Sequence, residues 1–258
     1  PGSSGYADIG GNDIIVSLGS FSGHVGSRSE QAGTFMHELG HNLNLRHGGF
    51  EDGPNCKPNY LSVMNYAFQF QDLSPTRPLD YSRSQLATLD ESILSESSGI
   101  SMSNAPGLQT VYGPVGLSGF STFKTSDPLS ATQNPIDWNR DLDTLDTVSL
   151  PIHNLGISGC SDSTISTLVG NNDWSSINLV FRTLSGTYSD GRFTNPDSLN
   201  ELTDVVQTSM QNLDGSTSPE PPATVHDAPV ITDIETPLTV YSGISMTAIG
   251  SFTDADGG

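Results

Sequence analysis

The chain has 258 residues, of which 34% are hydrophobic and 15% charged, and this length and composition suit one or two globular domains with a buried core. Its 9 Lys and Arg residues against 29 Asp and Glu residues give a net charge of -20, which repels phosphate backbones and anionic membrane surfaces, so no nucleic-acid partner is expected. No apolar run approaches the roughly 20 residues that a membrane-spanning helix needs, so no membrane span is predicted.

The first predicted elements are a short strand and a helix. β-Branched residues between glycines predict the strand over residues 12–18, and Ser27 and Glu30 have the spacing of a capping box at a helix start. Apolar residues then recur at helical spacing and predict one buried stripe, made of Ala32, Phe35, Met36, Leu39 and Leu43. Residues 48–78 are rich in Gly, Pro, Asn and Asp and are therefore predicted to be irregular loop.

The later elements give weaker patterns. A second helix is predicted over residues 82–96, followed by coil with short strands over residues 99–135. The apolar face of that helix is predicted to consist of Leu86, Leu89, Ile93 and Leu94. A strand is predicted over residues 177–181 and an amphipathic helix over residues 198–211.

Three of the six histidines fall inside the first predicted helix and just after it. His37 and His41 are four residues apart, so they lie on one helical face and can bind one metal ion, with Glu38 beside that face to hold a metal-bound water. On a continuous helix His47 would lie about 9 Å further along, so the helix must end first, and Asn44 is the candidate residue at positive φ. Three neutral imidazoles leave an open position for water, as in catalytic zinc sites. The alternative is a helix with surface histidines and no metal.

This pattern resembles a known peptidase signature. Residues 37–48 read His-Glu-x-x-His-x-x-Asn-x-x-His-Gly, which resembles the zinc-binding signature of the metzincins, where Gly stands in place of Asn44. Residues 62–66 resemble the family's Met-turn, which implies that Met64 lies beneath the metal rather than being an ordinary core residue. Tyr66 stands where astacin-like and serralysin-like metzincins carry a tyrosine, which implies a fifth ligand or a transition-state donor. A buried aromatic residue with a satisfied hydroxyl is the alternative for Tyr66.

The resemblance implies an α/β fold. A metzincin-like catalytic domain would occupy residues 1–212, with a partial N-terminal sheet lacking the family's first strands, an active-site helix and an irregular C-terminal subdomain. Residues 5–9 resemble the edge strand of the family's cleft, which can pair with an extended peptide. Residues 213–228 have the composition of a Pro/Ser/Thr linker, and residues 229–258 are predicted to begin a truncated Ig-like β-sandwich domain.

Two further groups of residues suggest sites. Oxygen ligands stand at alternate positions, as at the start of a calcium-binding EF-hand loop, in the series Asp137, Asn139, Asp141, Asp143 and Asp146. Leu142 stands where such loops have Gly, and Val148 where they have Glu, so calcium binding and a solvated acidic turn both remain open. Cys56 and Cys160 are expected to form a disulfide, since a free nucleophilic thiol would need a base that the sequence does not identify.

Together these features predict a secreted zinc endopeptidase, extracellular or at the cell surface, that hydrolyses proteins or peptides. His37, His41 and His47 would bind Zn²⁺, and Glu38 would activate the zinc-bound water and then protonate the leaving amine. The alternative, suggested by the trailing β domain, is a non-catalytic extracellular adhesion or binding module that keeps a metzincin shell. The presence of Glu38 favours the enzyme, because a structural zinc site needs no general base. The sequence predicts neither the cleavage specificity nor the oligomeric state.

Overall fold

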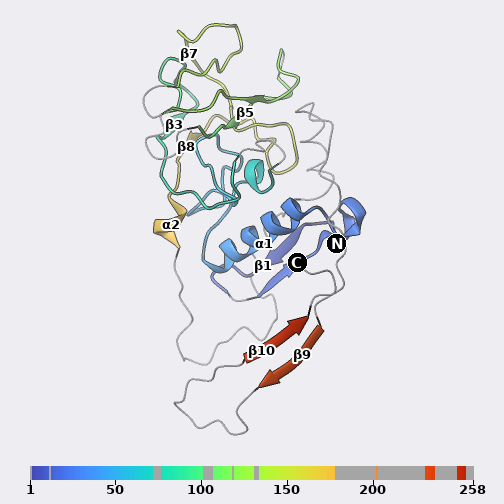
Figure 1. Ribbon diagram of the computed structural model, residues 1–258. Helices are drawn as coiled ribbons and strands as arrows, with labels where there is room; N and C mark the ends of the chain where they lie inside the picture. The colour runs from blue at the N-terminus through green and yellow to red at the C-terminus, as the bar shows by residue number, and fades with distance from the viewer. Residues whose placement is uncertain are drawn as a thin grey trace. The chain divides into compact units, whose positions relative to one another are not determined.

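A computed structural model describes residues 2–11, 13–71, 77–100, 107–117, 119–130, 134–177, 202, 230–235 and 249–253 (Figure 1). The chain divides into two units, Pro1–Pro222 and Ala223–Gly258. Within the described ranges, no helix has the length and apolar character needed to cross a membrane. The sheets are small and the helices few, an arrangement compatible with the α/β class at most, because every sheet in the described part has two strands.

The N-terminal part of the first unit is a strand pair covered by the longest helix. β1 (Gly5–Ala7) pairs antiparallel with β2 (Ile14–Val16), with Gly5 opposite Val16. Two 3₁₀ turns, η1 (Leu18–Ser20) and η2 (Ser22–His24), lead into α1 (Arg28–Asn42), which contacts both strands (Figure 1). The strand predicted over residues 12–18 is therefore confirmed at its centre, and residues 5–9 do contain a strand.

The start of α1 is the predicted capping box. Glu30 donates its backbone N–H to Ser27 Oγ over 3.2 Å, and the Glu30 carboxylate accepts the backbone N–H of Ser27 in return. This satisfies two backbone donors that a helix N-terminus otherwise leaves without partners.

The predicted apolar stripe of this helix is wrong. Ala32 is exposed, the Phe35 side chain is 52% exposed, and Met36, Leu39 and Leu43 are only half-buried. The helix instead buries a face of small and polar residues, namely Glu30, Gly33, Thr34, His37, Glu38, Gly40 and His41. A Cβ on Gly33 would overlap the Gln69 backbone, and one on Gly40 would overlap the Met64 sulfur, so the glycines admit the loop that follows the helix. Close approach to this loop, rather than apolar character, decides which face is buried.

The rest of the first unit is a chain of turns held by short antiparallel strand pairs. β3 (Leu89–Asp90) pairs with β8 (Thr167–Leu168), β4 (Leu94–Ser95) with β7 (Thr147–Val148), and β5 (Val111–Tyr112) with β6 (Lys124–Thr125). Residues 48–71 and 77–78 are irregular apart from the 3₁₀ turn η3 (Tyr66–Phe68), as predicted for the described part of that loop. A short helix, α2 (Asp173–Ser176), follows β8. The main core of this unit includes the buried side chains of Trp138 and Phe68.

The second helix predicted over residues 82–96 is wrong. That segment carries β3 and β4 instead, and Ile93, a member of the predicted apolar face, is 63% exposed. Asp90 accepts both the backbone N–H and the hydroxyl of Ser92, a local turn that competes with a helix. Glu91 is fully buried and accepts bonds from His153 and Ser166, so contacts remote in sequence fix the segment as extended backbone.

The second unit contains one described strand pair. β9 (Val230–Glu235) runs antiparallel to β10 (Ile249–Thr253), with a register shift between Ser251 and Phe252. The strand predicted over residues 177–181 and the helix predicted over residues 198–211 lie outside the described residues, apart from positions 177 and 202. The β-sandwich itself and the predicted domain boundaries stay predictions.

Candidate metal centre

The end of α1 turns the chain back as the histidine spacing requires. Asn44 has a φ of 70°, the left-handed conformation predicted for it. The Asn44 N–H donates to the His41 carbonyl over 2.9 Å, and the Leu45 N–H donates to the Gly40 carbonyl over 2.9 Å. These two bonds are the pair that defines a Schellman motif, and Leu45, which follows the left-handed residue, is buried with 1% of its surface exposed.

The three predicted histidines converge. His41 Nε2 and His47 Nε2 each lie 3.1 Å from His37 Nε2, and one ligand nitrogen from each ring lies within 4.8 Å of the others. All three side chains are buried. Nitrogens bound to one tetrahedral zinc ion stand about 3.3 Å apart, so the spacing is that of a ligand set.

The hydrogen bonds of two rings leave Nε2 available for a metal. His37 Nδ1 lies 2.9 Å from the carbonyl oxygen of Val63, and His41 Nδ1 lies 2.9 Å from that of Leu45. A carbonyl oxygen only accepts, so each Nδ1 carries the proton and each Nε2 presents a lone pair. Imidazole held in this way by a backbone carbonyl is the usual arrangement around metal ligands. The donor set therefore fits zinc, although it is not specific for zinc among the transition metals.

The predicted Met-turn packs against α1 and contacts His37. Met64 is fully buried, and its sulfur lies against Gly40, between the first two histidines of α1 in sequence. The preceding residue, Val63, supplies the carbonyl that orients His37. Ser62 Oγ accepts the Met64 N–H over 3.1 Å and so closes the turn. Met64 is thus a buried core residue that packs against the helical turn carrying His37 and His41.

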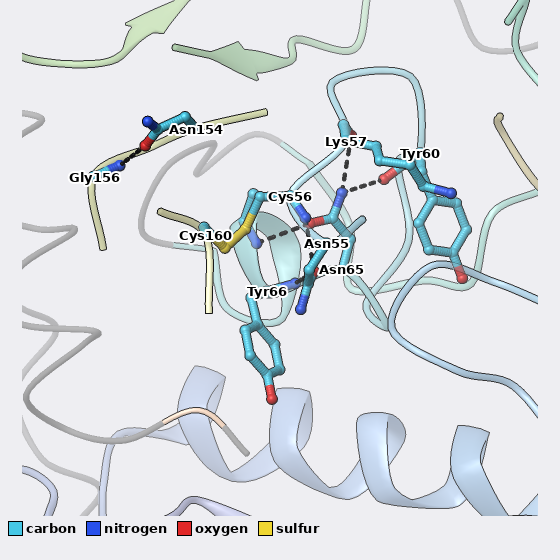
Figure 2. The surroundings of a disulfide bond; sticks show 10 residues. Asn55, Cys56, Lys57, Tyr60, Asn65, Tyr66, Asn154, Gly156 and Cys160 are labelled. Atoms are coloured by element: carbon cyan, nitrogen blue, oxygen red, sulfur yellow. Dashed lines mark hydrogen bonds between the residues drawn. A yellow bond between two sulfur atoms is a disulfide. The ribbon is translucent and has the colours of Figure 1, made fainter. Parts of the chain in front are cut away.

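Tyr66 lies beside the cluster, and Glu38 directly follows His37 in α1. The Glu38 side chain is fully buried under β1, where a Cβ on Gly5 would overlap its carboxylate. The Tyr66 ring is buried with its centroid 4.5 Å from that of His47 and 5.9 Å from that of His37. Figure 2 shows this ring pointing from η3 toward α1. The Tyr66 ring therefore contacts the histidine cluster directly, whereas the Glu38 carboxylate lies against β1.

No protein-family model, curated protein sequence or solved structure matches this chain. The metzincin resemblance therefore rests on the chain's own residues, above all on the histidine cluster and the turn beneath it.

The Cys56–Cys160 disulfide is present, as predicted (Figure 2). It joins the loop before η3 to a turn 104 residues away in the sequence. Gly159, next to Cys160, lies against the Tyr66 ring, because a Cβ there would stand 3.0 Å from Tyr66 Cε2. Asn55 binds both ends of the intervening loop, accepting the N–H of Cys56 over 2.7 Å and that of Tyr66 over 3.3 Å. The disulfide thus anchors the turn that packs against one side of the Tyr66 ring.

The acidic loop gathers a second group of possible ligands, which includes Glu96 in addition to residues of the predicted series. Asp141, Asp143 and Asp146 lie with Glu96 close enough to share an ion, whereas Asp137 and Asn139 accept backbone N–H groups of the loop. Glu96 is fully buried and accepts the N–H groups of Asn139 and Asp146. Glu96 could not be found from sequence, because its contact with the loop is not local. Calcium binding there stays a prediction, and isothermal titration calorimetry of chelator-treated protein with calcium tests it.

A buried carboxylate behind the Met-turn, Asp173, is also part of this region, although no sequence pattern predicts it. Asp173 is fully buried and accepts bonds from the Tyr60 hydroxyl, the Ser62 hydroxyl, the Ser82 N–H and the Asn171 amide. Burial raises the pKa of Asp173, and these four bonds oppose the rise. Burial likewise raises the pKa of Tyr60 well above its usual value. Since Ser62 opens the Met-turn, Asp173 fixes that turn from behind.

Proposed function

We propose that the chain is a zinc-dependent endopeptidase of the metzincin type, acting on proteins or peptides outside the cell or at the cell surface. The observation that carries this proposal is the convergence of His37, His41 and His47, with the Nδ1 atoms of the first two bonded to backbone carbonyls. The Cys56–Cys160 disulfide supports an oxidising compartment.

The neighbouring residues supply what peptide hydrolysis requires. Zinc bound by three imidazoles polarises a scissile carbonyl and lowers the pKa of a water molecule. Glu38 then accepts a proton from the attacking water at its carboxylate and donates it to the nitrogen of the leaving amine. The Tyr66 phenol, beside His47, donates a hydrogen bond to the oxygen on which negative charge develops. Met64 and the backbone of Val63 keep the rings in place.

Glu38→Gln is the variant that tests this function. The amide keeps the volume of the buried side chain but cannot accept a proton, so we expect zinc content to stay equal to wild type while cleavage of a protein substrate falls at least ~100-fold. Asp127→Asn, the same change of carboxylate to amide at an exposed residue, is the matched control and should cleave normally. Metal content is measured by elemental analysis and cleavage by gel and mass spectrometry.

Two outcomes would reject the proposal. Wild-type protein that folds but contains no zinc after equilibration with the metal would remove its basis. Equal cleavage by wild type and Glu38→Gln would assign any activity to a contaminating protease. Zinc binding without cleavage by the wild type would instead favour the adhesion or binding module.

A further inference from the structure

One of the chain's two lysines is buried beside the turn that carries His47. Lys57 is 1% exposed, whereas Lys124 is an exposed residue of β6. Lys57 Nζ donates to the carbonyl oxygen of Gly48 over 2.7 Å and to that of Val169 over 2.6 Å. A buried ammonium is costly unless it is hydrogen-bonded, and both of these bonds go to neutral backbone carbonyls. Such an arrangement requires a structural reason beyond packing.

The first carbonyl belongs to the residue that directly follows the third histidine. The Gly48 N–H donates to the Glu51 carbonyl over 2.9 Å, while Arg46 and Gly49 exchange backbone bonds across the same turn. Lys57 holds the Gly48 carbonyl from the other side. The backbone on the C-terminal side of His47 is therefore fixed at both its donor and its acceptor. His47 lies beyond the end of α1, unlike His37 and His41, so the backbone of this turn fixes where its side chain starts.

The second carbonyl ties the same turn to a segment remote in sequence. Val169 lies four residues before Asp173, the carboxylate that fixes the Met-turn. Between them Asn171 packs against Gly49, where a Cβ would stand 2.5 Å from Asn171 Cβ. The backbone carbonyl of Lys57 also accepts the side-chain amide of Asn65, within the Met-turn segment, over 3.0 Å. Residues 169–173 thus support the third histidine through Lys57 and the methionine through Asp173.

We propose that Lys57 is a positioning residue for the zinc ligand His47, acting through the Gly48 carbonyl and anchored to the Val169 carbonyl. This inference rests on the proposed zinc site, and it assigns to Lys57 no contact with substrate or metal. Supporting interactions around a metal ligand typically change metal affinity 10–100-fold when they are removed. Lys57 should have an effect of about that size.

Lys57→Met tests the inference, with Lys124→Met as the matched control. Methionine keeps an unbranched chain of similar length in the buried site but donates no hydrogen bond. We expect zinc affinity, measured by competition with a chromophoric chelator, to fall about 10–100-fold for Lys57→Met and to be unchanged for Lys124→Met. The d–d absorption bands of the cobalt-substituted protein should shift in Lys57→Met, because they report the geometry of the ligands. Loss of general stability alone would not move those bands.

A double-mutant cycle shows whether the effect passes through His47. In a His47→Ala background the lysine has no third ligand to position, so Lys57→Met should cause no further loss of zinc affinity. Equal losses in both backgrounds, or an unshifted cobalt spectrum, would overturn the inference while leaving the zinc site intact. A wild type that binds no zinc would overturn the proposed function together with this inference. If Lys57→Met does not fold, Lys57→Gln replaces it, and failure of both to fold without metal would make Lys57 a general stability residue.

Discussion

Gly5 lies so close to the buried carboxylate of Glu38 that a Cβ on the glycine would overlap Oε1. Glu38 belongs to α1, and Gly5 belongs to β1, the strand that α1 covers. The backbone of β1 therefore forms one wall of the position occupied by the proposed general base. A side chain at residue 5 has no room unless the carboxylate moves.

Gly5→Ala should impair catalysis more than metal binding. The added methyl group displaces the Glu38 carboxylate. The three histidines are held by other contacts and should keep their geometry. We expect kcat to fall about 10-fold or more, since misplacing a general base removes part of its contribution of ~100-fold or more. Gly2→Ala is the control, because nothing lies within 4 Å of a Cβ at that exposed position. An unchanged kcat for Gly5→Ala would mean that Glu38 has room to move without loss of function.

Substitutions of Asn44 should separate the turn from the ligand set. Its φ of 70° suits glycine best, so Asn44→Gly should preserve or raise both stability and zinc affinity. Asn44→Ala should lower the free energy of unfolding by about 1 kcal/mol, because a Cβ without a compensating polar group is disfavoured there. Thermal unfolding of the apo-protein measures the change in stability, which for Asn44→Ala should lower the midpoint by roughly 2–4 °C. Chelator competition measures the zinc affinity. A clear loss of zinc affinity in Asn44→Gly would show that the asparagine side chain has another role.

The parts of the site that could be predicted from sequence are those fixed by local geometry. His37 and His41 meet because four residues make about one helical turn. Asn44 can be identified as the residue that ends the helix because, apart from glycine, few residue types adopt positive φ readily. The capping box at Ser27 is local for the same reason. In each case the interacting residues lie within one or two turns of chain, so their spacing determines their contact.

The parts that were missed depend on contacts between distant residues. Lys57 reaches Val169, and Asp173 reaches Ser62, with no periodicity in the sequence to mark either pair. The apolar stripe of α1 was wrong because glycines allow close packing by a polar face, as at Gly40. Hydropathy alone cannot show that a loop with a methionine will occupy that space.

Asp173→Ala should destabilise the whole first unit. The change leaves four buried donors without their acceptor, including the hydroxyls of Tyr60 and Ser62, and each such group costs about 1–3 kcal/mol. We expect the free energy of unfolding to fall by about 3 kcal/mol or more, measured by urea denaturation of the apo-protein. Asp127→Ala, at an exposed aspartate, should change it by less than about 0.5 kcal/mol. Equal stability of the two variants would contradict a central role for this carboxylate.

Removal of the disulfide should affect both stability and Tyr66. The bond closes a loop spanning a sequence separation of 104 residues, for which loss of the cross-link costs about 4 kcal/mol. Because Gly159 lies against the Tyr66 ring, the double variant Cys56→Ala/Cys160→Ala should also lower kcat while zinc affinity changes little. Intact mass before and after reduction checks the bond itself, through the gain of two hydrogen atoms. A wild-type mass that does not change on reduction would show that the bond does not form in solution.

Lys57 should make the stability of the apo-protein depend on pH in the alkaline range. Burial lowers its pKa from 10.5 to about 8, against the opposing attraction of Glu51 and Asp173. Between these two values the unfolded chain holds a proton on Lys57 that the folded chain has released, so this residue's contribution to the free energy of unfolding rises with pH. The rise amounts to at most about 3 kcal/mol, since each tenfold change in proton affinity is worth about 1.4 kcal/mol.

Comparison of wild type with Lys57→Met isolates this contribution from the other titrating groups. Urea unfolding at pH 8 and at pH 10.5 should show the difference in stability moving in favour of the wild type at the higher pH, and Lys124→Met should show no such movement. The neutral amine still carries N–H groups for the carbonyls of Gly48 and Val169, so the contacts persist while the cost of burying a charge disappears. A difference independent of pH would mean that Lys57 keeps its ordinary pKa in the folded chain, and hence that water reaches its ammonium group.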